Sequence, residues 1–186
     1  MKRETIGIVL DYFPHGKSSE ALAEPTAQVL GESYFTLLEV IIPTSVSTGD
    51  RIVLDKEDPA CKIERIKKRI TFSDLSVTSQ NQLKNIIKEI VIKKEKDFVR
   101  FINTATAINI RSHSLELLPS IGKKHLHLIL EERSKKPFES FDDIKKRVPH
   151  LTSVPDIFVE EIMEEIKGNA KYYLFSKPPF QKFERY

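Results

Sequence analysis

The sequence is poor in the residues that cross-link small domains and build many cofactor sites. Its 186 residues include one cysteine, Cys61, six glycines and no tryptophan. A single cysteine excludes an intramolecular disulfide and a zinc site made of several cysteines, and it fits a reducing compartment. The glycine pattern argues against a phosphate-binding loop, because the motif needs a glycine five positions before Gly16, where Asp11 stands.

Long apolar segments are missing as well. The run from Ile6 to Leu10 is too short to span a bilayer and contains Gly7. We therefore expect neither a membrane anchor nor a secretion signal, and hence a cytoplasmic protein. Because the net charge is only +3, a polyanionic partner has to be argued from the distribution of charge and not from its total.

The first part of the chain has the composition of short β-strands. Apolar and β-branched runs separated by turn residues predict strands at Thr5–Leu10, Tyr34–Ile42, Arg51–Leu54 and Cys61–Lys67. About five strands in some seventy residues suggest a sheet that buries its edges by closing on itself. We therefore expect a small OB-like β-barrel over residues 1–75.

The rest of the chain has helical periodicity, so the predicted fold class is α+β. Apolar residues recur at helical spacing at Leu83, Ile86, Ile87, Ile90 and Val91, and again at Phe98, Phe101, Ile102 and Ala105. Thr78 or Ser79 is expected to cap the first of these helices. We expect a helical connector over residues 76–109, an all-helical module over 110–168 and a C-terminal tail over 169–186.

A sharp bend between two predicted helices is the main functional signal. Leu115–Leu118 ends one helix, Pro119–Gly122 forms the bend, and the next helix runs from Lys123 to Arg133. The start of a helix has unpaired amide hydrogens and a partial positive charge, so an oxyanion can bind there. Lys123 and Lys124 oppose the helix dipole, and a bound phosphate would stabilise them. The alternative is an ordinary helix-helix turn with two solvated lysines.

Residues 118–133 resemble the helix-hairpin-helix motif of DNA and RNA repair, recombination and translation proteins. Pro137–Ile144 resembles the linker and third helix of the tandem form, so the resemblance implies a tandem helix-hairpin-helix domain over residues 110–168. It implies phosphate binding at Ser120, Ile121, Gly122, Lys123 and Lys124. It also implies a monovalent cation at hairpin carbonyls near Ser120 and Gly122. Ser120 stands where the motif usually has glycine.

The second hairpin implied by this resemblance is Val148–Ser153. It lacks both glycines, so we expect it to be a structural partner of the first. The alternative is that it also contacts phosphate, through Lys145, Lys146, Arg147 or His150.

The order of barrel, connector and tandem module resembles, over nearly the whole chain, an uncharacterised archaeal protein family with no assigned activity. Genes of that family lie beside those for an RNA polymerase subunit and a ribosomal RNA dimethyltransferase. The resemblance therefore favours RNA over DNA as the ligand, by association and not from the residues themselves.

A second basic cluster lies on the last predicted strand of the barrel and directly after it, and comprises Lys62, Arg65, Lys67, Lys68 and Arg69. Basic residues on an edge strand also deter aggregation, so a solvated edge is the alternative to nucleic-acid binding. OB-type domains bind single strands by combining cationic grooves with stacked rings, and the available rings are Tyr12, Phe13, Tyr34 and Phe35. Such rings are also typical of a core. The aromatic and basic tail fits either packing or single-strand contact.

No arrangement of residues indicates catalysis. The histidines lack metal-ligand spacing, and the four glutamates between residues 160 and 165 are expected to form the polar face of a helix. We predict a non-catalytic nucleic-acid-binding protein without a cofactor, with a role in translation or RNA processing and a possible protein partner in a ribonucleoprotein. The alternatives are a protein-protein adaptor and a DNA repair or recombination accessory factor. The sequence gives no indication of the oligomeric state.

Overall fold

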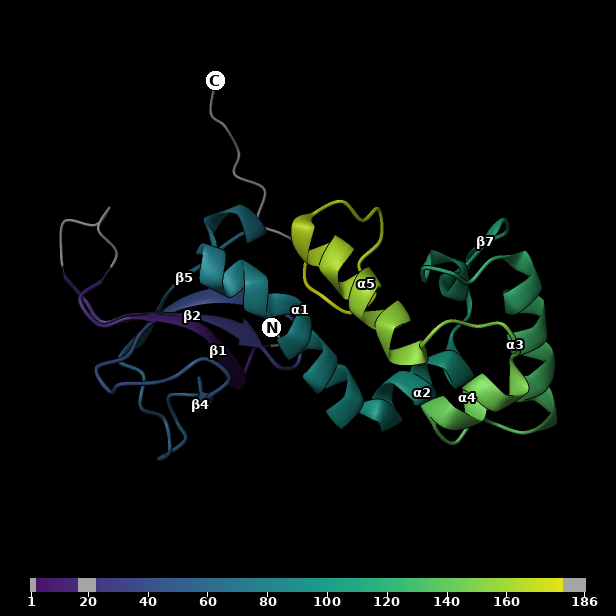
Figure 1. Ribbon diagram of the computed structural model, residues 1–186, viewed down its shortest axis with the longest axis horizontal. Coiled ribbons are helices and arrows are strands. Elements are labelled where there is room, and N and C mark those ends of the chain that lie inside the picture. Colours follow the sequence, from purple (N-terminus) through teal and green to yellow (C-terminus); the bar gives the residue numbers. More distant parts are fainter. Residues whose placement is uncertain (1–2, 17–22, 179–186) are drawn as a thin grey trace, which may run out of the picture. The chain divides into compact units, whose positions relative to one another are not determined.

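The computed structural model describes residues 3–16 and 23–178 (Figure 1). The fold is mixed α+β, as predicted, with a five-stranded antiparallel sheet, a two-stranded ribbon and, within the described residues, five α-helices. The chain divides into two compact units. The sheet unit contains the described residues up to Ile86 together with those from Ile162 onward, and the helical unit is Ile87–Glu161. These boundaries differ from the predicted segments.

The sheet unit is built on antiparallel strands in the order β4-β1-β2-β3-β5. The strands are β1 (Ile6–Phe13), β2 (Thr26–Gly31), β3 (Leu37–Ile41), β4 (Arg51–Val53) and β5 (Arg65–Arg69). β2 and β3 are buried along their whole lengths because they are central and largely apolar. The core of this unit contains Val9, Ala27, Val29, Leu38, Val40, Ile42, Leu54 and Ile63.

No strand pairing closes this sheet into a barrel within the described residues. A closed barrel would pair β4 with β5, but β4 pairs with β1 and β5 pairs with β3. β4 is only three residues long, and β5 consists of Ile66 and four basic residues. A short strand and a charged edge both disfavour edge-to-edge pairing. The sheet is therefore open where the sequence predicted a closed barrel.

A buried glutamine of β2 fixes the start of helix α1 (Val77–Lys93). Ser76 Oγ accepts a hydrogen bond from the Ser79 amide (3.0 Å) and so caps the helix. The Ser79 hydroxyl instead donates to Gln28 Oε1 (2.7 Å). The predicted capping residues, Thr78 and Ser79, are therefore wrong, because the helix begins earlier and Gln28 engages the Ser79 side chain.

The helical unit surrounds an aromatic core. Its elements are α2 (Glu95–Thr104), β6 (Ala107–Asn109), β7 (Ser112–His113), the short 3-10 helix η2 (Ser114–Leu117), α3 (Lys123–Lys135), α4 (Phe141–Arg147) and the first part of α5 (Val154–Lys167). The fully buried ring of Phe158 has its centroid 4.8 Å from that of Phe98 and 6.1 Å from that of Phe141. Aromatic pairs at such separations add to the stabilisation that burial alone provides.

The glutamates of α5 do not share one environment. Glu165, in the sheet unit, is fully buried, and its carboxylate accepts hydrogen bonds from the amides of Leu174, Phe175 and Ser176. Burial raises the pKa of Glu165, and these amide hydrogen bonds oppose the shift. The predicted solvated face is therefore wrong for Glu165, which these amides partner, and for Glu161, which is also buried.

Candidate nucleic-acid interface

The bend before α3, which we call the first hairpin (Leu118–Lys124), has a left-handed residue at its centre. Ser120 has φ = 65°. On either side of it Leu118 and Ile121 are buried, and the Ile121 amide donates to the Leu118 carbonyl (3.2 Å). A left-handed conformation costs an L-residue about 1–2 kcal/mol. The two buried neighbours therefore hold Ser120 in a backbone shape that glycine adopts more readily.

The amides that follow this bend are unpaired. Within the part of the chain that the structure describes, the amides of Gly122, Lys123 and Lys124 have no hydrogen-bond partner, and no side chain caps α3. The first backbone bond of the helix runs from the Leu126 amide to the Gly122 carbonyl (2.9 Å). A Cβ added at Gly122 would meet no atom within 4 Å. These amides are therefore open to an external acceptor.

The side chains around these amides are cationic or neutral. Lys123 and Lys124 are exposed and, among the described residues, form no ion pair, and the first turn of α3 has no acidic residue. The His125 ring is half-buried, with Nδ1 3.0 Å from the Ser120 carbonyl oxygen. That contact occupies one of the carbonyls at which a monovalent cation is predicted. The binding of a monovalent cation at these carbonyls stays a prediction.

The second hairpin (Val148–Ser153) repeats the backbone of the first. His150 has φ = 62°, and Val148 and Leu151 on either side of it are buried. The helix that follows differs in chemistry, because Pro155 has no amide hydrogen and Asp156 is an acid. The carboxylate of Asp156 pairs with Lys88 (2.8 Å).

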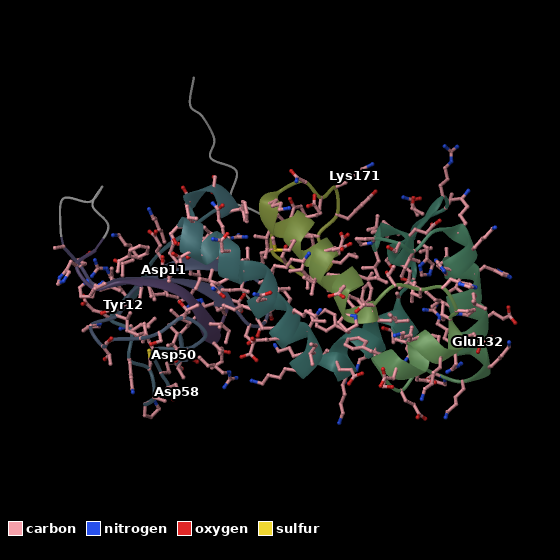
Figure 2. All side chains as sticks on the ribbon, viewed as in Figure 1. Asp11, Tyr12, Asp50, Asp58, Glu132 and Lys171 are labelled. Atoms are coloured by element: carbon pink, nitrogen blue, oxygen red, sulfur yellow. The ribbon has the colours of Figure 1, made fainter. Side chains whose placement is uncertain are left out.

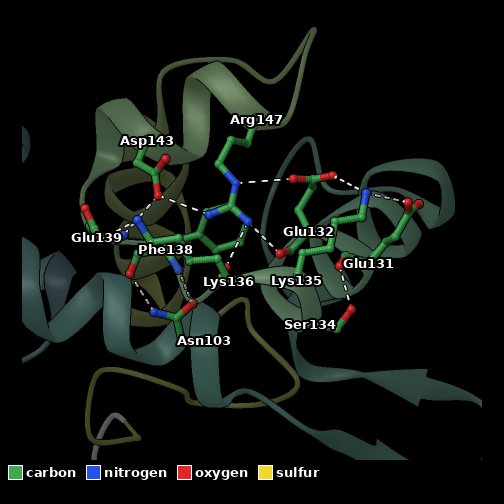
Figure 3. Close-up of polar contacts among 10 residues, drawn as sticks. All are labelled: Asn103, Glu131, Glu132, Ser134, Lys135, Lys136, Phe138, Glu139, Asp143 and Arg147. Atoms are coloured by element: carbon green, nitrogen blue, oxygen red, sulfur yellow. Dashed lines mark hydrogen bonds and ion pairs between the residues drawn. The ribbon is translucent and has the colours of Figure 1, made fainter.

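Of the predicted cations near the second hairpin, Arg147 is bound within the helical unit (Figure 3). Its Nη2 donates to the carbonyls of Glu132 and Lys136, and its Nε donates to the Glu132 carboxylate (3.2 Å). Its Nη1 donates to Asp143 (3.2 Å), and its guanidinium lies 4.5 Å from the Phe138 ring centroid. Arg147 therefore ties α3, the following loop and α4 together.

The two lysines beside Arg147 are in a different situation. Lys145 and Lys146 are exposed and form no ion pair among the described residues. Glu132, by contrast, is held by two cations, and hydrogen bonds from Lys135 and then Arg147 lower the pKa of its carboxyl. No sequence pattern indicated this network, because two of the four acceptors of Arg147 are backbone carbonyls, those of Glu132 and Lys136.

The basic cluster on β5 is largely neutralised. Arg65 pairs with Glu24 (2.7 Å) and Glu64 (2.8 Å), and the hydrogen bond to Glu24 contributes most to raising the pKa of Arg65. Lys68 pairs with the buried carboxylate of Glu39 (3.2 Å). Lys67, on the same strand, is partly buried.

Arg69, the last residue of β5, faces the C-terminal segment. Its Nη2 donates to the carbonyls of Lys177 (2.7 Å) and Pro178 (2.6 Å), and burial lowers the pKa of its guanidinium. β5 therefore does not present its four predicted cations as one unpaired surface.

An open cleft of about 590 Å³ lies in the sheet unit on the side where β4 and β5 fail to pair. Leu38, Leu54 and Ile66 give it apolar walls, and its charged lining is mixed, with basic residues such as Lys56 and acidic ones such as Glu57. No aromatic ring lines it among the described residues.

The rings predicted for base stacking lie elsewhere. Tyr12 packs partly buried against the core (Figure 2), Phe35 is buried, and the Tyr34 ring centroid lies 4.7 Å from Lys177 Nζ. Phe13 is half-buried at the end of β1. The cleft and the rings are therefore not assembled into one stacking surface.

The described residues also bear on metal and membrane binding. They contain no group of three or more histidine, cysteine, aspartate or glutamate side chains arranged to hold a metal ion. No helix in the described part of the chain combines the length and apolarity needed to cross a bilayer.

Comparison with known proteins identifies the family. Residues 3–177 match the family described as "Protein of unknown function (DUF655)". The chain is 37% identical over 180 residues to the uncharacterized protein MJ0038 of Methanocaldococcus jannaschii, a match that covers 95% of this chain and 81% of the relative. It is also similar to the crystal structure of Af1531 from Archaeoglobus fulgidus, with a TM-score of 0.84 and 39% identity, covering 94% of this chain and 100% of that one. The resemblance to an uncharacterised archaeal family is thus confirmed, and this chain belongs to the DUF655 family.

Proposed function

We propose that this protein binds the phosphate backbone of nucleic acid without catalysing a reaction, and that the first hairpin is its principal contact. The observation that supports this most directly is the coincidence, at one bend, of three unpaired amides with two exposed lysines that have no ion-pair partner in the described structure. Amide donors and lysine charges suit the several acceptor oxygens of a phosphate.

The repeated backbone of the two hairpins supports a tandem helix-hairpin-helix. Ser120 and His150 share a left-handed conformation, and each lies between buried apolar neighbours. In this proposal the first hairpin binds phosphate and the second packs against it. Lys145 and Lys146 extend the positive surface, and Arg147 is left out because its guanidinium is already bound within the unit.

RNA is the favoured ligand, in a translation or RNA-processing role. Backbone contacts of this kind read phosphates and not base identity, so the expected binding has little sequence preference. The open sheet contributes less in this proposal, because Arg65 and Lys68 are already paired with glutamates. The five strands of the sheet are compatible with descent from an OB-like barrel. Such a descent requires that the pairing of β4 with β5, which would close the barrel, has been lost.

A second candidate is a protein-protein adaptor, and the open cleft is the observation that favours it. Among the described residues β4 pairs only with β1 and β5 only with β3, and the cleft lies on the side where these two strands do not pair with each other. An extended peptide can add to such an edge through main-chain hydrogen bonds. A pull-down whose partner survives nuclease treatment and is lost after Ile66→Asp would favour the adaptor.

Charge reversal at the first hairpin tests the proposed function. We expect Lys123→Glu/Lys124→Glu to weaken binding to labelled RNA and DNA oligonucleotides about tenfold or more, measured by fluorescence anisotropy. The slope of log affinity against log salt should become shallower by roughly 1.4–1.8, as two phosphate contacts are lost.

The matched control is Lys84→Glu/Lys96→Glu, which changes the net charge by the same amount. Both control lysines are exposed on helices α1 and α2 and form no ion pair among the described residues. The control should lose much less affinity than the hairpin variant. Equal losses in the two variants, or an unchanged affinity in the hairpin variant, would reject the first hairpin as the binding site.

A further inference from the structure

The ribbon formed by β6 and β7 ends in an exposed apolar tip. Ile110 is fully exposed (106% of its reference area), and Ile108 is 37% exposed. All three residues of β6 are exposed, although Ile108 is also partly covered. Ile108 and Ile110 are thus two exposed β-branched apolar residues that lie two positions apart in the ribbon.

The base of this ribbon is held firmly. The amide and the hydroxyl of Ser114 both donate to the Thr106 carbonyl, at 3.0 and 2.7 Å. The Leu115 amide donates to Nδ1 of His113 (3.1 Å), and the Leu115 side chain is fully buried. The Glu116 carboxylate accepts a hydrogen bond from the His113 amide (2.9 Å). The tip therefore extends from a backbone that several hydrogen bonds hold in place.

The turn at the tip has its own fixed geometry and charge. Asn109 Oδ1 accepts a hydrogen bond from the Arg111 amide (2.8 Å), which shapes the reversal. Arg111 is exposed and forms no ion pair among the described residues. Glu116 is the one acidic residue in the sequence between Thr106 and Lys124, and its carboxylate is engaged by the His113 amide.

The ribbon is joined to the first hairpin by direct packing. Contacts link β7 to η2 and η2 to α3, all within the helical unit. η2 leads straight into the first hairpin, so one short, buried element positions both the apolar tip and the unpaired amides.

We propose that this tip is a wedge for double-stranded nucleic acid. Ile110 inserts between neighbouring base pairs, and Arg111 binds an adjacent phosphate. Isoleucine is one of the side chains that architectural proteins insert into base steps, whereas single-strand binding relies on aromatic faces that this tip lacks. The inference rests on the function proposed above and adds a duplex substrate and a local unstacking of its bases.

The test compares Ile110→Ser with Ile92→Ser, an equivalent change at a residue of α1 that is 53% exposed. The probes are a 20-base-pair duplex with 2-aminopurine at its centre, made as DNA and as RNA, and the matching single strands. Unstacking raises 2-aminopurine fluorescence. We expect the wild-type protein to raise the 2-aminopurine fluorescence of a duplex. Ile110→Ser should abolish this increase and weaken duplex binding about fivefold.

Ile92→Ser should behave as wild type, and single-strand affinity should be unchanged by Ile110→Ser. Circular dichroism verifies folding, which a fully exposed residue should not affect. The DNA and RNA arms identify which duplex is the ligand. No fluorescence rise with wild type, or equal losses on duplex and single strand in Ile110→Ser, would overturn the wedge.

The failure of the wedge can be told apart from a failure of the proposed function. If Lys123→Glu/Lys124→Glu loses affinity while Ile110→Ser binds and unstacks as wild type, the wedge is wrong and backbone binding stands. If neither variant differs from wild type, both proposals fall.

Discussion

The two hairpins of the helical unit have the same backbone and opposite surroundings. Ser120 and His150 have φ values of 65° and 62°, and buried apolar residues flank each of them. At the helix start that follows the first bend lie two lysines and three amides that have no partner among the described residues, whereas Pro155 and Asp156 lie at the helix start that follows the second. The shape of the turn is therefore shared, and the capacity to bind an anion depends on the first turn of the next helix.

The cations at the start of α3 and at the end of α4 differ in the same way. Lys123 and Lys124 are solvated, whereas Arg147, before the second hairpin, donates to backbone carbonyls and carboxylates. A guanidinium with its planar set of donors suits several fixed acceptors at once, and an ammonium does not. The comparison supports the proposal that the first hairpin binds a ligand, and it gives Arg147, before the second hairpin, an internal structural role.

Removing Arg147 should give the largest effect on stability. We expect Arg147→Met to lower the free energy of unfolding by about 2 kcal/mol, because the α3–α4 loop carbonyls lose charged donors while the apolar stem is retained. Urea unfolding followed by circular dichroism measures this. Arg147→Lys should restore only part of the loss.

Lys146→Met is the control for this change, because Lys146 is exposed one residue away. It should shift stability by less than about 0.5 kcal/mol. If the two substitutions cost the same, the contrast between a structural arginine and a solvated lysine is wrong.

The sequence predicted those features of this comparison that depend on local chemistry. The sequence predicted the first bend, the resemblance to a tandem helix-hairpin-helix implied the second, and the lysines after Gly122 marked the first as a candidate site. The lack of glycine at residues 120 and 150 did not prevent the left-handed turns, because buried neighbours impose them.

Features that depend on distant parts of the chain were not predictable. The role of Arg147 depends on backbone carbonyls at the end of α3. The burial of Glu165 depends on amides that lie about ten residues later in the chain. The open edge between β4 and β5 likewise reflects the lengths and charges of strands that are not neighbours in sequence. The periodicity of a segment predicts which face of that helix or strand is buried. It does not predict which backbone groups from other parts of the chain contact that face.

Glycine at the centres of the two hairpins should have a smaller, opposite effect. Ser120→Gly and His150→Gly each relieve a left-handed L-residue, and the greater entropy of glycine in the unfolded chain offsets part of that gain. We expect each to raise the free energy of unfolding by roughly 0.5–1 kcal/mol in urea titrations. A gain at one position and a loss at the other would show that the two turns are not equivalent.

The smallest expected effect is a pH dependence of stability through His113, the residue that caps the start of η2. Burial, and then the charge of Arg133, lower the pKa of His113 below its ordinary value of 6.5, while Glu116 opposes the shift. Below about pH 6.5 the unfolded chain therefore binds a proton that the folded chain does not. The free energy of unfolding should fall as pH drops through this window and be fully regained above it.

Because carboxylates also titrate on acidification, the measurement is the difference between wild type and His113→Asn from about pH 7 to about pH 5. Asparagine keeps an acceptor for the Leu115 amide and does not titrate. Wild type should lose more stability than His113→Asn, while His127→Asn, at an exposed position of α3, should follow wild type. Parallel curves for wild type and His113→Asn would mean that His113 takes up its proton equally in the folded and unfolded chain.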